Sequence, residues 1–213
     1  MNIVIVGAGN VGRALATGWT KAGHKITLVV RDPASSKAGE LKQQGFSVVA
    51  ANEAAATAAE VIVLAVPWSA LATVVKGLGS LAGKVVIDVT NPIADAPPVN
   101  GVVKFFTNLD ESLMERSQRE FPQARFVKAF SSVGKDFMIN PNFKAGKPTM
   151  FICGNDEAAK QTVRGVLDQF GWETADMGMA EAARAIEPLC MLWLIPGFLR
   201  NEWNHAFKLL RLE

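Results

Sequence analysis

The chain has 213 residues, of which 49% are hydrophobic and 20% charged, and its 22 basic and 20 acidic side chains give a formal net charge of +2. This composition is typical of a folded globular protein; it argues against a disordered chain and favours one domain with a small addition. The basic side chains are scattered and form no stripe that could follow a phosphate backbone, so we expect no nucleic acid partner.

The sequence carries no sign of secretion or membrane insertion. Residues 2–6 run directly into a glycine turn, without a basic segment, a long apolar stretch or a cleavage site before it. The longest apolar stretch, residues 188–199, holds two prolines and is shorter than the roughly 20 residues of a membrane span, so we interpret it as buried and expect no membrane partner. Cys153 and Cys190 lack CxxC spacing, which predicts no disulfide framework, no metal site and a cytoplasmic location.

Short β-branched runs alternate with helix-like stretches along the chain, as in sheets connected by crossover helices. This pattern predicts an α/β protein: a Rossmann-type doubly wound, mostly parallel sheet with a small helical C-terminal extension. Strands are expected at residues 3–6, 26–30, 46–49, 61–66, 85–89, 125–129, 149–153 and 172–175. Helices are expected at residues 11–22, 34–44, 52–59, 69–78, 109–120 and 158–170, with caps at Asn52 and around Asp156.

Two later segments lack this alternation. Residues 131–148, which contain Gly134 and Gly146, are expected to form a mobile flap near the nicotinamide. Residues 180–212 are expected to be mostly helical, and Pro188 and Pro196 are expected to kink or break them into two or three pieces.

The first expected strand leads into a glycine loop with the sequence Gly7-Ala8-Gly9-Asn10-Val11-Gly12, and a helix follows at once. Glycines at this spacing allow a tight turn, close approach of a pyrophosphate and tight packing of helix on strand, while the helix N-terminus faces the anion. The flanking strand, the helix and the subsequent βαβ pattern are separate requirements, and all are met. We therefore predict a dinucleotide site on these six residues; the alternative is a purely structural turn.

The end of the second expected strand reads Val30-Arg31-Asp32. An acidic residue here would hold the ribose 2′-hydroxyl of NAD, whereas a basic residue favours the 2′-phosphate of NADP. Arg31 offers a planar charged fork, and Lys37 and two serines follow as further donors, whereas Asp32 would repel a phosphate. We predict NADP(H) as cofactor, with Arg31 and Lys37 as ligands; in the alternative, Arg31 and Asp32 form a solvated pair indifferent to the cofactor.

Two loops are expected to border the nicotinamide half of the cofactor, because ligands of open parallel sheets lie beyond the carboxyl ends of the strands. Their residues are Ala65, Val66, Pro67 and Trp68 in one loop and Asn91 and Pro92 in the other. Simple packing would explain Trp68 equally well.

No catalytic residue is evident. The chain has no tyrosine, which excludes a Tyr-Lys dyad, and its two histidines are expected away from the cofactor. His24 precedes the second strand, and His205 falls in the C-terminal segment among aromatic residues. Hydride transfer between two redox cofactors requires alignment and exclusion of water more than a protein acid, whereas a carbonyl reductase would usually show a proton donor.

Five segments resemble the deazaflavin-dependent NADP oxidoreductase family. They are residues 3–12, 63–68 (VLAVPW), 128–133 (KAFSSV), 150–156 (MFICGND) and 184–189 (RAIEPL). The likeness spans the chain in matching order, and ferric-reductase oxidoreductase domains and the N-terminal catalytic domain of pyrroline-5-carboxylate reductases look similar.

The resemblance implies an NADPH-binding Rossmann domain, a short helical C-terminal part, a homodimer and hydride exchange with a deazaflavin. By position, it implies that the glycine loop holds the pyrophosphate and Arg31 the 2′-phosphate. Residues 66–68 would contact the middle of the cofactor, and residues 91–92 would approach the nicotinamide ribose. The chain differs from the archaeal members at Val30 and Asp32, which bears on the choice of NADP, and at Phe130, which bears on the acceptor.

These observations predict an NADPH-dependent oxidoreductase that transfers a hydride between NADP(H) and a small-molecule acceptor, a deazaflavin or flavin-like compound. One alternative is reduction of a small imine or carbonyl substrate, against which the short C-terminal part argues. A second is a non-catalytic, redox-sensing NADPH-binding module.

Residues 1–178 are expected to form the NADP-binding Rossmann domain and residues 179–213 a short helical segment. Apolar side chains in this segment and just before it could line an acceptor pocket, but we favour a homodimer interface through the C-terminal helices. They are Met177, Met179, Met191, Trp193, Phe198 and Trp203.

Overall fold

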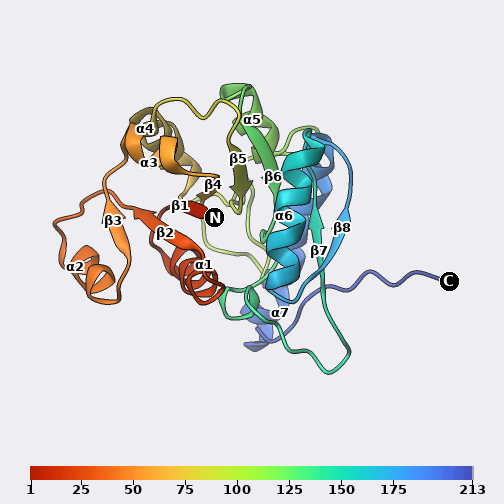
Figure 1. Ribbon diagram of the computed structural model, residues 1–213. Helices are drawn as coiled ribbons and strands as arrows, with labels where there is room; N and C mark the ends of the chain where they lie inside the picture. The colour runs from red at the N-terminus through yellow and green to blue at the C-terminus, as the bar shows by residue number, and fades with distance from the viewer. Residues whose placement is uncertain (213) are drawn as a thin grey trace.

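The computed structural model describes residues 1–212 and contains a parallel six-stranded sheet in the order β3-β2-β1-β4-β5-β6 (Figure 1). The strands are β1 (Asn2–Val6), β2 (Lys25–Val29), β3 (Ser47–Val49), β4 (Val61–Leu64), β5 (Val85–Asp88) and β6 (Arg125–Lys128). This strand order is that of the Rossmann fold, so the predicted doubly wound α/β architecture is confirmed.

Helices cover both faces of the sheet, because alternate residues of each strand point to opposite sides. Ile3 and Ile5 of β1 belong to one apolar core, whereas Val4 and Val6 belong to the other. The first core includes side chains of α1 (Asn10–Lys21), α2 (Ser36–Gln43) and α6 (Glu157–Gln169). The second includes side chains of α3 (Glu53–Ala58), α4 (Trp68–Leu78) and α5 (Leu113–Glu120).

A second parallel pair, β7 (Thr149–Ile152) and β8 (Glu173–Asp176), lies beside β6 (Figure 1). An isolated antiparallel bridge between Lys128 and Cys153 connects it to the main sheet. The expected strands at residues 149–153 and 172–175 are therefore present within one residue of their predicted bounds.

Side-chain caps fix where several helices begin. Asn52 and Asp156 accept hydrogen bonds from the backbone N–H groups of Ala55 and Ala159, which confirms both predicted caps. The helix expected from residue 109 instead begins at Leu113, because Ser112 and Glu115 form a capping box there. Residues 131–148 contain one short 3₁₀ helix, η1 (Lys135–Phe137).

The C-terminal helix α7 (Ala183–Arg200), preceded by η2 (Ala180–Ala182), differs from the prediction. It runs without a break through Pro188 and Pro196, so the expected breaks at these prolines are wrong, whereas an expected kink stays a prediction. Each proline removes only one helical hydrogen bond, while packing on the domain retains the rest. Asn201 adopts a left-handed conformation (φ 54°) that ends the helix, and the expectation of helix over residues 201–212 is also wrong.

The segment after α7 folds back onto the molecule. Trp193 and His205 exchange hydrogen bonds, and the Phe207 carbonyl accepts one from the Thr149 N–H at the start of β7. These contacts join residues 205–207 to both α7 and β7. The domain boundary expected at residue 178 stays a prediction.

By length and composition, α7 together with η2 is the one helix among residues 1–212 that could cross a membrane. It nevertheless packs on the sheet domain through Ala183, Ile186 and Glu187, which are buried. Leu192, Phe198 and Leu199 are about half exposed, and the expected homodimer through this helix stays a prediction.

Candidate functional site

The glycine loop joins β1 to α1 at the carboxyl edge of the sheet. Gly7 has φ +105°, its N–H donates to the Val29 carbonyl, and a Cβ there would lie 2.5 Å from the Ala65 carbonyl oxygen. A Cβ at Gly12 would lie 1.9 Å from the Gly7 carbonyl oxygen. These two glycines are therefore required by the close packing of α1 against β1 and β4.

Gly9 has a different environment, since a Cβ there would have no other atom within 4 Å. It precedes α1, whose N-terminus has no side-chain cap and no acidic residue in its first turn. The first N–H groups of an α-helix lack intrahelical partners, and the helix dipole favours an anion beside them. Gly9 and Asn10 are exposed, while Ala8 and Val11 are partly buried against the core, so the polar groups that the latter two can offer a ligand are those of the backbone.

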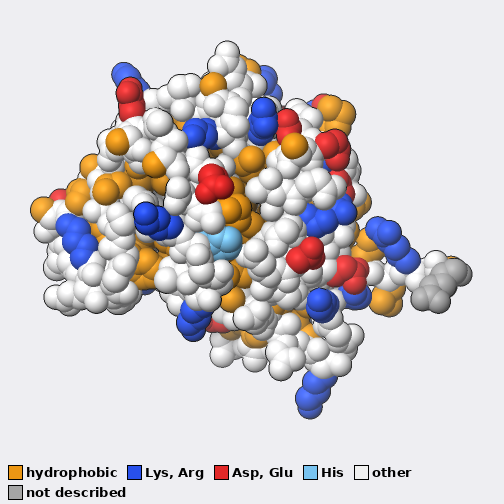
Figure 2. Space-filling view, viewed as in Figure 1, with side chains coloured by type: hydrophobic (Ala, Val, Ile, Leu, Met, Phe, Trp, Pro, Cys, Tyr) orange, Lys and Arg blue, Asp and Glu red, His pale blue; other side chains and the backbone are white. Residues whose placement is uncertain are grey.

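Arg31 lies just beyond the carboxyl end of β2. The last residue of this strand, Val29, accepts a hydrogen bond from the Gly7 N–H, so the end of β2 lies beside the glycine loop. Arg31 is exposed and forms no ion pair within residues 1–212. In particular, Arg31 and Asp32 form no ion pair with each other, and the Asp32 carboxylate accepts a hydrogen bond from the Ala34 N–H at 2.8 Å. Lys37 is exposed near the start of α2. On the face in Figure 2, basic and acidic side chains are interspersed.

The loop at residues 65–68 lies against the glycine loop. Ala65 donates its N–H to the Val6 carbonyl, and Val66 Cγ1 lies 2.8 Å from the position of a Gly7 Cβ. Pro67 is the exposed cap residue of α4. Trp68, the first residue of α4, packs partly against the second core, which agrees with the packing interpretation.

The loop after β5 carries polar atoms without partners. Asn91 Nδ2 donates to the Ser131 carbonyl at 2.8 Å, which ties the ends of β5 and β6 together. Asn91 Oδ1 and Ser131 Oγ are buried and have no hydrogen bond within the described chain. Such atoms are uncommon in folded proteins and indicate a place where a ligand or water completes the structure. Pro92 is buried beside them.

A buried charge cluster, missed by the sequence analysis, lies behind this loop. It consists of Asp88, Lys128 and Glu187, whose side chains are at most 2% exposed. Lys128 Nζ lies 2.8 Å from Asp88 Oδ2 and 2.9 Å from Glu187 Oε1. Burial alone would lower the pKa of Lys128, but the two carboxylates outweigh burial and raise it above its usual value. We call these three residues the Lys128 cluster.

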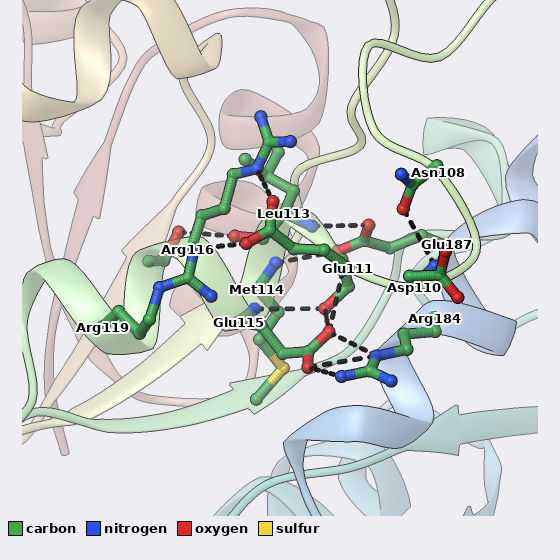
Figure 3. A network of polar contacts seen from close by, with 12 residues as sticks. Asn108, Asp110, Glu111, Leu113, Met114, Glu115, Arg116, Arg119, Arg184 and Glu187 are labelled. Carbon is green, nitrogen blue, oxygen red and sulfur yellow. Dashed lines mark hydrogen bonds and ion pairs between the residues drawn. The ribbon is translucent and has the colours of Figure 1, made fainter.

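Glu187 also connects α7 to α5 (Figure 3). Its carboxylate accepts hydrogen bonds from the Leu113 and Met114 N–H groups at 2.9 and 3.0 Å, in the first turn of α5. Arg184, one turn earlier on α7, donates to Glu115 at 3.0 Å. A glutamate within an apolar helix and a lysine ending an apolar strand were the available sequence signals for this cluster, since ionic side chains are rarely buried unless paired.

The Glu115–Arg184 pair gives a prediction for acid stability. Burial raises the pKa of Glu115, but hydrogen bonds from Arg184 and Ser112 outweigh it and lower the pKa to about 2. Because the pKa of Glu115 is lowered in the folded state, its carboxylate stabilises the fold at pH values above its ordinary pKa of 4.5. This contribution is lost as the pH falls toward the folded-state pKa of about 2. At pH 7, Glu115→Gln should therefore reduce the free energy of unfolding by roughly 1–3 kcal/mol.

Urea denaturation measured from neutral to acidic pH would check this prediction. The difference in free energy of unfolding between wild type and Glu115→Gln should become smaller below pH 4.5. Glu120→Gln, at the exposed end of the same helix, is the matched control and should change stability little at any pH. A Glu115→Gln effect of the same size throughout the range would contradict the assignment.

The remaining candidates lie away from the loops. His24 contacts Gln169 Oε1 and the N-terminal amine, and His205 stacks on Trp193, outside any helix. Phe130 is 1% exposed and its ring packs against core aromatic rings, so its side chain does not face solvent; that the loop around it meets the electron acceptor stays a prediction. Phe130 has a positive φ of 60°, which is uncommon for a non-glycine residue.

Comparison with known proteins agrees with this geometry. The family model "NADP oxidoreductase coenzyme F420-dependent" matches residues 2–92. The F420-dependent NADP reductase of Methanocaldococcus jannaschii is 30% identical over an alignment of 225 positions that covers 100% of this chain and 100% of that one. A crystal structure assigned as an F420-dependent NADP reductase from Arthrobacter sp. FB24 has a TM-score of 0.89 at 29% identity and covers 99% of this chain and 100% of that one.

The rat metalloreductase STEAP3 is 29% identical over 199 residues, which cover 92% of this chain but only 38% of the relative. The full-length match to the M. jannaschii enzyme, together with the model match over the glycine loop, establishes the relationship. The chain therefore belongs to the family of F420-dependent NADP reductases, which are oxidoreductases.

Proposed function

We propose that the chain binds NADPH with the pyrophosphate over the glycine loop. The observation that carries this proposal is the open, uncapped N-terminus of α1 beside Gly9, next to a strand that ends in an unpaired arginine. The residues present fit the cofactor. Gly7 and Gly12 bring the backbone close together, Gly9 leaves space for the phosphates, and no carboxylate in the first turn opposes them.

The preference for NADP over NAD rests on Arg31 and Lys37. Both side chains are exposed beyond the end of β2, where the adenosine ribose lies in Rossmann proteins. The carboxylate of Asp32, the main objection to NADP, is held by the Ala34 N–H in its own turn. Arg31 is therefore available for a charge-assisted hydrogen bond to a 2′-phosphate.

The acceptor that we propose is a deazaflavin, as the names of the full-length relatives suggest. NADPH, when bound, supplies a hydride that the acceptor takes up. Residues 65–68 and 91–92 would confine the nicotinamide and exclude water, and the buried atoms Asn91 Oδ1 and Ser131 Oγ beside them have no hydrogen-bond partner within residues 1–212. We assign no proton-transferring side chain.

Reduction of an imine or carbonyl would require a proton donor near the nicotinamide. At the carboxyl ends of β5 and β6, the titratable side chains of the strands themselves are Asp88 and Lys128, and both are closed off in the Lys128 cluster. In the loop after β6, the exposed Lys135 and Asp136 pair with each other. The enclosure of Asp88 and Lys128 favours an acceptor that needs no acid from the protein. It gives no support to imine or carbonyl reduction.

The purified protein can be tested with NADPH and a panel of acceptors: a deazaflavin of the F420 type, FMN, FAD and a cyclic imine. We expect the reduced-nicotinamide absorbance to fall with the deazaflavin, and to fall faster with NADPH than with NADH. NADPH binding without turnover on the whole panel would contradict the reductase and would support the redox-sensing alternative. Turnover confined to the imine would reassign the substrate.

A further inference from the structure

The ammonium group of Lys128 has three hydrogen-bond partners in the interior of the protein. Besides Asp88 and Glu187, it donates to the Thr90 carbonyl oxygen at 2.8 Å. These three partners use the full donor capacity of a lysine. One side chain at the end of β6 thus holds the end of β5, the loop after β5 and helix α7.

Thr90 is fixed at three of its atoms. Its N–H and its hydroxyl both donate to Asp88 Oδ1, at 2.9 and 2.6 Å, and its carbonyl accepts from Lys128. The next residue is Asn91, whose amide donates to the Ser131 carbonyl. Residues 91–92, which we propose beside the nicotinamide, are therefore held by the Lys128 cluster through Thr90 and by the loop after β6 through Asn91.

Stability alone does not account for ionic groups at this place. Burying three charged side chains requires removing them from water, and apolar side chains of similar volume often stabilise a fold equally well. Apolar side chains, however, cannot hold a backbone carbonyl and a hydroxyl in one orientation. The charges supply directional control of Thr90, which packing does not.

We infer that Lys128 is a positioning residue for hydride transfer, because through Thr90 it sets the orientation of Asn91 at the nicotinamide. Glu187 binds the same ammonium group, so this orientation also depends on the packing of α7 against the sheet. This inference rests on the proposed function. The pyrophosphate and 2′-phosphate sites lie on other loops, so loss of Lys128 should affect kcat far more than the Kd for NADPH.

The test is Lys128→Met, which retains an unbranched side chain without the charge. With saturating deazaflavin, we expect kcat to fall at least about tenfold and the Kd for NADPH to change by less than about twofold, because small misplacements of reacting groups have large effects on rate. Lys160→Met is the matched control. Lys160 is also a buried lysine, paired with Asp176 at 2.9 Å, but it joins α6 to β8 and does not contact the loop.

Lys160→Met should lower stability and leave kcat within about twofold of wild type, since it removes the ion pairs of a buried lysine with Asp176 and Glu157 without moving Thr90. A folded Lys128→Met protein with unchanged kcat would overturn the inference. So would an equal loss of kcat in both variants, because that result would reduce Lys128 to a general stabilising residue. If Lys128→Met does not fold, Glu187→Gln removes one charge at constant size, and its kcat is judged against the same control.

A second readout needs no acceptor. The fluorescence of bound NADPH reports the surroundings of the nicotinamide, so its emission should change in Lys128→Met or Glu187→Gln and stay as in wild type in Lys160→Met. If wild type reduces no deazaflavin, the acceptor assignment fails, but this emission still decides whether the Lys128 cluster positions the nicotinamide. Unchanged emission in both cluster variants would overturn the inference.

Discussion

Replacing Gly12 with alanine is expected to reduce the free energy of unfolding by roughly 3 kcal/mol and to abolish measurable NADPH binding. The added Cβ would lie 1.9 Å from the Gly7 carbonyl oxygen, and a backbone atom cannot move aside by rotating about a side-chain bond. Helix α1 would have to separate from β1, which would displace the N-terminus proposed to face the pyrophosphate. Urea denaturation and NADPH titration would measure the two effects.

Gly9→Ala is the matched comparison in the same loop. No atom lies within 4 Å of the new Cβ, and the φ of −72° at this residue suits alanine, so stability should change by less than about 0.5 kcal/mol. Affinity for NADPH should nevertheless fall roughly tenfold, because the methyl group would occupy space proposed for the phosphates. Wild-type affinity in Gly9→Ala would place the pyrophosphate elsewhere, and equal destabilisation of both variants would contradict the packing explanation.

Arg31→Ala is expected to weaken NADPH binding by about 1–3 kcal/mol, the range for a hydrogen bond to a charged group, while NADH binding hardly changes. The physical reason is that the 2′-phosphate alone distinguishes the two cofactors, and Arg31 is the nearest unpaired cation beyond the end of β2. Titrations of both cofactors at fixed ionic strength would give the ratio of affinities.

Lys25→Ala provides the control, because Lys25 is an exposed cation at the opposite end of the same strand. It should leave the affinity ratio unchanged. Equal losses of NADPH and NADH in Arg31→Ala would remove the 2′-phosphate assignment, and a matching loss in Lys25→Ala would indicate a nonspecific charge effect.

Most of the fold could be predicted because its signals are local. Continuous apolar runs such as residues 61–64 indicate strands buried on both faces, and Asn52 and Asp156 begin helices by bonding to backbone three residues ahead. The glycine loop could be predicted for the same reason, since the turn, the neighbouring strand and the helix are adjacent in sequence.

The rest depends on contacts between distant segments. Glu187 caps a helix that begins more than seventy residues earlier, and Lys128 finds Asp88 on a neighbouring strand. Helix α7 contains two prolines and is retained by its packing on the sheet, which no local sequence pattern shows. Sequence periodicity likewise does not show that Phe130 adopts a positive φ and has its ring in the core.

The Lys128 cluster has a consequence for biosynthesis, because its three residues leave the ribosome at different times. Asp88 and Lys128 emerge with the sheet, whereas Glu187 emerges only after all eight strands described for residues 1–212. Until then the first turn of α5 has no anionic cap, and Lys128 has a single carboxylate partner. The buried ionic contacts can therefore be completed only when α7, the last helix of residues 1–212 in chain order, packs on the sheet.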